Sequence, residues 1–138
     1  MSEASPEHKL GPLRELRDEE LGIIKKMISG TSFREKIEPN IYEMRVQDMP
    51  DGGMGSIKFF CSGRPRSELE YGKQIAEAAF KDADGVPVSA TLSVDKAGNL
   101  FELDIFKADG SPLVRYPDLR DFKIIKRNGK LGYAPPQS

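Results

Sequence analysis

The sequence predicts an α+β domain in which one N-terminal helix packs on a mostly antiparallel sheet of five to six strands. Two patterns indicate this class. Residues 18–29 repeat apolar side chains at helical spacing, whereas residues 86–95 and 101–105 alternate apolar and polar side chains, as half-buried strands do. An Asp-Gly pair and a Gly-Asn pair stand at the starts of these two alternating segments, where turns are expected.

The length of 138 residues suits one domain with its own core. We expect this domain to span residues 13–133. Residues 1–12 are polar and rich in Ser, Pro and Glu, and residues 134–138 contain two prolines. We therefore expect both ends to be disordered tails, and we expect the first to be no signal peptide.

The predicted helix covers residues 18–29. Asp18 is placed to cap its start, and two further acids occupy the first turn, where the helix dipole favours negative charge. Gly30 is placed to end the helix. The apolar stripe consists of Leu21, Ile24, Met27 and Ile28.

After the helix the apolar period changes from 3.6 to 2. Residues 41–46 alternate, residues 49–55 are rich in glycine, and residues 56–61 alternate again. This pattern predicts a hairpin with a flexible tip, followed by a loop over residues 62–67.

Residues 73–82 are compatible with two structures. Their composition favours a helix of about three turns. Their weak alternation, and the Asp84-Gly85 pair that leads into the next strand, favour the first strand of a hairpin. We predict a strand and keep the helix as the alternative.

The clearest strand pair is formed by residues 86–95 and 101–105. Core positions are even-numbered on the first strand and odd-numbered on the second. A four-residue turn over residues 96–99 meets this parity, whereas a three-residue turn needs a bulge with Gly98 at positive φ. The four-residue register places Val94 opposite Phe101, Leu92 opposite Leu103, Thr91 opposite Asp104 and Ser93 opposite Glu102. The last predicted strand covers residues 122–126, and Asn128-Gly129 predicts a turn with a return over 131–133.

The composition excludes several kinds of chemistry. A single cysteine excludes an internal disulfide and a CxxC zinc site. The only histidine, His8, lies in the expected N-terminal tail, so no catalytic base is available to Cys61 or to a serine. No GxSxG, GxGxxG or phosphate-loop motif occurs, and no apolar run is long enough to cross a membrane. We expect no cofactor, no bound metal and no membrane partner.

The charges are balanced overall at −1 but unevenly placed. Residues 68–109 hold nine acids against four lysines, a net of −5, and residues 115–130 hold six bases against two acids, a net of +4. The basic segment lacks an aromatic stacking pattern, which argues against nucleic acid. The acids on the polar face of the predicted sheet, with their hydroxyl neighbours, are the candidate partner-binding residues: Glu77, Thr91, Ser93, Glu102 and Asp104.

The chain resembles a small, uncharacterised family of bacterial domains over residues 13–117. The resemblance rests on the run from Leu13 to Glu20 and on segments between Asp84 and Leu113, among them Glu102-Leu103-Asp104-Ile105 after a Gly-Asn turn. This family implies no activity, cofactor or catalytic residue. In size, acidic sheet and lack of catalytic machinery, the chain is also similar to small immunity proteins that neutralise bacterial toxins.

Three hypotheses follow. The first is a cytoplasmic, non-catalytic module that binds a basic protein surface through the acidic sheet face. The second is a small-molecule-binding protein or enzyme with a site between the helix and the sheet, marked by a perturbed carboxylate. The third is homodimerisation through an edge strand at residues 41–46, with a monomer as the alternative state.

Overall fold

The computed structural model describes residues 12–60 and 70–127. Cys61, His8, the loop at 62–67 and the return strand at 131–133 lie outside these ranges, as do the expected tails apart from Pro12. The described strands form one antiparallel sheet in the order β1-β2-β3-β6-β5-β4-β7. The elements in chain order are β1 (Arg14–Glu15), α1 (Asp18–Ile28), α2 (Arg34–Ile37), the 3₁₀ helix η2 (Glu38–Glu43), β2 (Arg45–Asp48), β3 (Ile57–Phe60), β4 (Tyr71–Lys81), β5 (Pro87–Asp95), β6 (Leu100–Lys107), the 3₁₀ helix η4 (Leu119–Asp121) and β7 (Lys123–Arg127).

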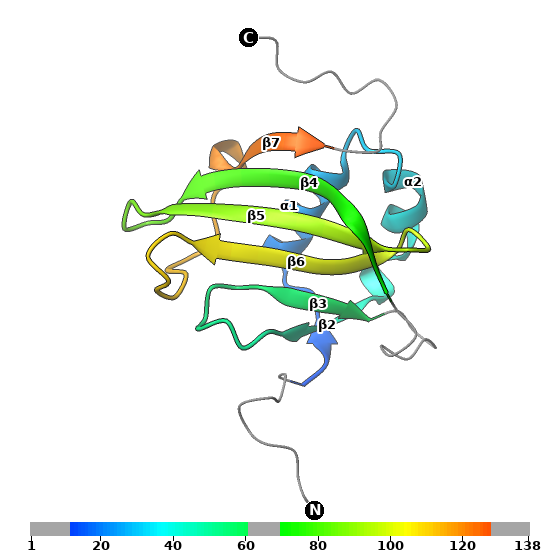
Figure 1. Ribbon diagram of the computed structural model, residues 1–138, viewed down its shortest axis with the longest axis horizontal. Coiled ribbons are helices and arrows are strands. Elements are labelled where there is room, and N and C mark those ends of the chain that lie inside the picture. The colour runs from blue at the N-terminus through cyan, green and yellow to red at the C-terminus, as the bar shows by residue number, and fades with distance from the viewer. Residues whose placement is uncertain (1–11, 61–69, 128–138) are drawn as a thin grey trace, which may run out of the picture.

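The α+β class is confirmed, but two details of the prediction are wrong. The described sheet has seven strands instead of five to six, because the two-residue β1 adds to the edge of β2. The main helix is also not the first element, since β1 precedes it, and a second short helix follows it. Figure 1 shows α1 and α2 behind the sheet, so that the opposite face points toward the viewer. We call that opposite side the open face.

Helix α1 confirms the predicted helix, which ends one residue earlier than expected, but Asp18 is its first residue and not its N-cap. It begins at Asp18, with Arg17 at the N-cap position, and Gly30 follows it at a φ of 82°. The apolar stripe packs on the sheet and places Ile24, Met27 and Ile28 fully out of solvent. The space between helix and sheet is therefore filled by side chains at these positions.

The predicted strand at residues 41–46 is the main error of the sequence prediction. Residues 38–43 form η2, which has Pro39 in its first turn, and β2 begins only at Arg45. The buried residues Ile37, Ile41 and Met44 recur every three or four positions, which is helical spacing and not alternation. Val46 pairs with β1 on one side and β3 on the other, so this segment is no sheet edge for homodimerisation.

Residues 73–81 belong to strand β4, which confirms the predicted strand, and Asp82 lies just beyond its end. A register shift between Gln74 and Ala76 explains the weak alternation, because it leaves both Ile75 and Ala76 buried. Beyond the shift, Ala78 and Phe80 face the core in the regular pattern.

The β5–β6 register confirms three of the four predicted pairs: Leu92 with Leu103, Thr91 with Asp104, and Ser93 with Glu102. The fourth is wrong, because Val94 pairs with Leu100 across a register shift. The structure instead has the alternative, a bulge with Gly98 at a positive φ of 90°. Leu100 takes the core position, with 1% of its surface exposed. Phe101 instead contacts Tyr71 edge to face, with ring centroids 6.0 Å apart.

Candidate functional site

The five predicted binding residues lie on the open face and form two rows across the strands. Glu77, Thr91 and Asp104 are direct neighbours on β4, β5 and β6. Ser93 and Glu102 form the next row on β5 and β6, but Ser93 is buried and its hydroxyl donates to the Glu102 carbonyl at 3.3 Å. The even-numbered neighbours Ala90, Leu92 and Val94 of β5 are buried in the core, so these polar side chains point away from α1.

Basic residues flank this group on both sides. Lys126 of β7 is the cross-strand neighbour of Glu77, and Lys58 of β3 contacts Glu102 at 3.5 Å. Asp104 is exposed and accepts a hydrogen bond from Ser56 Oγ at 3.3 Å. The acidic and basic segments of the sequence therefore meet on one face, with acids on the central strands and lysines beside them.

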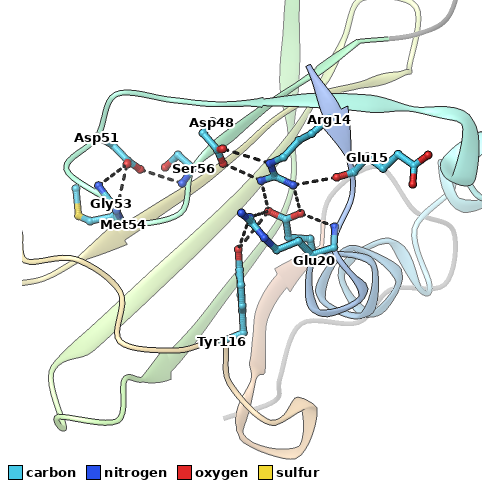
Figure 2. A network of polar contacts seen from close by, with 10 residues as sticks. Arg14, Glu15, Glu20, Asp48, Asp51, Gly53, Met54, Ser56 and Tyr116 are labelled. Atoms are coloured by element: carbon cyan, nitrogen blue, oxygen red, sulfur yellow. Dashed lines mark hydrogen bonds and ion pairs between the residues drawn. The ribbon is translucent and has the colours of Figure 1, made fainter. Parts of the chain in front are cut away.

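A second polar cluster centres on Glu20, which is completely buried at the start of α1. The Arg14 guanidinium donates to both Glu20 oxygens, at 2.9 and 2.8 Å, and also binds Asp48 of β2 at 2.7 Å. Figure 2 shows Arg14 between these two carboxylates. We call this set, together with Arg17 and Tyr116, the Glu20 network.

Glu20 also accepts hydrogen bonds from the other donors of the network, Arg17 and Tyr116. The backbone N–H of Arg17 donates to Glu20 Oε1 at 2.8 Å, and the Tyr116 hydroxyl donates to Oε2 at 3.2 Å. Burial opposes ionisation of Glu20, but the bonds from Arg14 and Arg17 outweigh it and hold its pKa below the ordinary value. Burial and the Glu20 charge raise the pKa of Tyr116 to about 12. The network is therefore an ionised carboxylate with a neutral tyrosine.

A third cluster surrounds Lys107, whose side chain is 1% exposed at the end of β6. Its ammonium lies 2.8 Å from Asp82 and 2.6 Å from Asp84, and it donates to the Pro112 carbonyl at 3.1 Å. Burial works against its charge, but the two aspartates outweigh that effect and raise its pKa. We call Lys107, Asp82 and Asp84 the Lys107 cluster.

Asp82 connects this cluster to the loop after β6. Its oxygens accept the backbone N–H groups of Val114 at 2.7 Å and Arg115 at 3.3 Å. Asp51 has a similar role in the β2–β3 loop, where it accepts N–H groups from Gly53, Met54 and Ser56. These two loops and the start of α1 enclose an open cleft of about 570 Å³, whose lining includes Arg17, Asp48, Leu113 and Tyr116.

Neither Glu20 nor Lys107 is among the residues predicted from the sequence, although each carries a usable signal. Glu20 precedes Ile23, Ile24 and Met27 by three, four and seven positions, so it lies on the apolar side of the helix. Lys107 has the same parity as Leu103 and Ile105 on β6. A charged residue at a core position requires a buried partner, so each of these positions indicates a buried polar cluster.

Among residues 12–60 and 70–127, no group of three or more His, Cys, Asp or Glu side chains could hold a metal ion. None of the helices in this part of the chain has the length and hydrophobicity that crossing a membrane requires.

The clusters predict a decline of stability in acid. Burial raises the pKa of Asp82, but Lys107 and three backbone N–H groups outweigh it and lower the value from 3.8 to about 2. A carboxyl with a lower pKa in the folded state stabilises the fold above its unfolded pKa, and this contribution is lost as pH falls toward the folded value. Urea unfolding at a series of pH values should show the free energy of unfolding falling between about pH 4 and pH 2.

The control for this profile is an exposed acid outside both clusters. Glu43→Gln should keep the wild-type slope, whereas Asp82→Asn should flatten it. Equal slopes for Asp82→Asn and wild type would show that Asp82 does not cause the acid effect.

Comparison with known proteins confirms the resemblance seen in the sequence. A family model described as a domain of unknown function (DUF6984) matches residues 13–117. No curated protein and no solved structure matches. The matched range contains β1 to β6, the complete Glu20 network and the Lys107 cluster.

Proposed function

The chain belongs to the family of domains of unknown function DUF6984, and from this premise we propose that it is a non-catalytic binding module whose open face receives a protein partner. The observation that carries the proposal is the alignment of Glu77, Thr91 and Asp104 across three neighbouring strands. Such a row offers a rigid polar surface that needs no ordering when a partner binds.

The chemistry of the partner follows from the charges. The acids on β6 lie near the middle of the sheet, and Asp104 is exposed and forms no ion pair with a residue that the structure describes. A basic group of the partner would approach Asp104, whereas acidic groups would suit the flanking Lys58 and Lys126. A bacterial toxin with a basic surface, bound in the cytoplasm as immunity proteins bind toxins, is one such partner, supported by likeness in size and charge.

The experiment is affinity capture from a lysate of the source organism, with charge-reversed variants beside the wild-type protein. Glu102→Lys/Asp104→Lys should lose a stoichiometric partner, with affinity lowered at least about tenfold, because like charges then oppose the basic group. Glu43→Lys, in η2 and outside the sheet, is the matched control and should retain it. A partner held equally by both variants would exclude this face, and the absence of any stoichiometric partner would contradict the proposal.

A small-molecule site is the second candidate function, and the open cleft beside the start of α1 favours it. The predicted position of such a site, between the helix and the sheet, is filled by Ile24, Met27 and Ile28. The cleft instead lies beside the start of α1, and the Glu20 network borders it.

A further inference from the structure

We infer that the cleft beside α1 binds a small organic monocarboxylate, with its carboxylate held by Arg17 and Arg115. This site is separate from the open-face proposal, and either can fail without the other. It deepens the second candidate function by naming the class of ligand. The groups in the cleft differ in how much hydrogen-bonding capacity they have left for a ligand.

The two aspartates of the cleft are already engaged by the protein. Asp48 accepts two hydrogen bonds from Arg14, at 2.7 and 3.2 Å. Asp51 accepts three backbone N–H groups of its own loop, at 2.9 to 3.2 Å. Figure 2 shows both side chains turned toward these partners. Their hydrogen-bonding capacity is therefore largely taken up before any ligand arrives, while their negative charges remain at the cleft.

Arg17 and Arg115, in contrast, still have hydrogen-bond donors that a ligand could use. The Arg17 guanidinium is half exposed, and its contacts with Glu20 and with the Tyr116 hydroxyl are both long, at 3.4 Å. Arg115 is exposed, and its guanidinium forms no ion pair with a residue in the described ranges. Guanidinium groups with free donors bind carboxylates in a bidentate geometry.

The surroundings restrict the ligand to a single negative charge. Glu19 also lines the cleft and, together with Asp48 and Asp51, would repel a second charge such as that of phosphate. Met49, Leu113 and Val114 supply apolar surface for the body of the ligand. A volume of about 570 Å³ is within the range of small-molecule sites.

The buried clusters hold this site in shape. Tyr116 is fixed by Glu20, and the backbone on both sides of the Val114–Arg115 bond is fixed by Asp82. The Leu113 N–H also donates to the Gly53 carbonyl at 3.0 Å, which joins the two loops across the cleft. A ligand would therefore meet walls that are already ordered, and little binding energy would be lost in ordering them.

The test is an NMR titration of the full chain with phenylacetate and with hexanoate, following backbone amides and arginine Nε–H signals. We expect saturable shifts at Arg17, Leu113 and Tyr116, with a dissociation constant of about 1 mM or tighter. Arg17→Gln and Arg115→Gln should each weaken binding by about tenfold or more, because each removes a charge-assisted donor. Arg120→Gln, an exposed arginine that pairs with Asp118, is the matched control and should bind as the wild type does.

Three results would overturn the inference: no saturable shift with either monocarboxylate, equal affinity for inorganic phosphate, or unchanged affinity in both cleft variants. Two substitutions are used because a folding defect in one leaves the other informative. Unchanged amide spectra away from the cleft will identify variants that remain folded. Protein capture on the open face is measured with other substitutions, so its outcome does not affect this one.

Discussion

Lys107→Met is expected to destabilise the fold by about 3–5 kcal/mol, the usual result of removing one partner from a buried ion pair. Methionine preserves most of the volume of the lysine stem, so the loss reports mainly on charge. The side chain of Asp82 has no exposed surface, and without Lys107 its carboxylate would stay buried beside backbone N–H groups alone. Urea unfolding followed by circular dichroism measures the effect.

Two comparison variants test whether the loss in Lys107→Met comes from the unpaired buried charge of Asp82. Lys58→Met removes a lysine whose contact with Glu102 leaves both side chains about a quarter exposed, at 26%. Such a pair contributes less than about 1 kcal/mol. Lys107→Met/Asp82→Asn should recover part of the loss, because the amide oxygen still accepts backbone N–H groups while the unpaired charge is gone. If Lys107→Met cost no more than Lys58→Met, the Lys107 cluster would not be a stabilising element.

The β5–β6 pair shows what a sequence can predict well. Strict alternation defined the two faces, and parity alone placed Thr91 opposite Asp104 and Ser93 opposite Glu102. The same reasoning failed at Val94, because a register shift adds one residue to β6 and changes the parity locally. Parity showed that a shorter turn would require a bulge beside Gly98, but it did not decide between the two turns.

The charge pattern shows a different limit. Charges were counted along the chain, but β7 returns to pair with β4 and brings Lys126 beside Glu77, 49 positions earlier. The net charge of −5 over residues 68–109 therefore did not describe the charge of the sheet face that these residues form with their neighbours. The pairing order of strands decides which charges meet, and that order depends on packing across the whole core.

The buried clusters were missed for a related reason. Asp82 and Lys107 are 25 positions apart, and Arg14 and Asp48 are 34 apart. Each charged residue alone is typical of a solvated surface, and only the tertiary fold brings the partners together. Glu20 and Lys107 were recognisable as charged residues at core positions, whereas the identity of their partners required the structure.

Glu20→Gln is expected to cost about 2–3 kcal/mol, the range for losing hydrogen bonds to a buried charged group. The substitution preserves shape, but its amide offers one acceptor oxygen where the carboxylate offers two. Arg14 would lose its bidentate partner, because in either orientation the amide nitrogen would face an N–H group of the guanidinium. Because Tyr116 lines the cleft, we also expect the monocarboxylate affinity to fall in this variant.

The matched control is Asp48→Asn, on the other side of the same Arg14. The Asp48 side chain is 49% exposed, whereas that of Glu20 is 1% exposed, so the two substitutions differ mainly in burial. Asp48→Asn should lower the free energy of unfolding by less than about 1 kcal/mol, because water replaces the lost contact. Urea unfolding of both variants gives the comparison. Equal losses in the free energy of unfolding would mean that Asp48 stabilises Arg14 as strongly as Glu20 does. A loss in Asp48→Asn alone would contradict the assignment of Glu20 as the centre of the network.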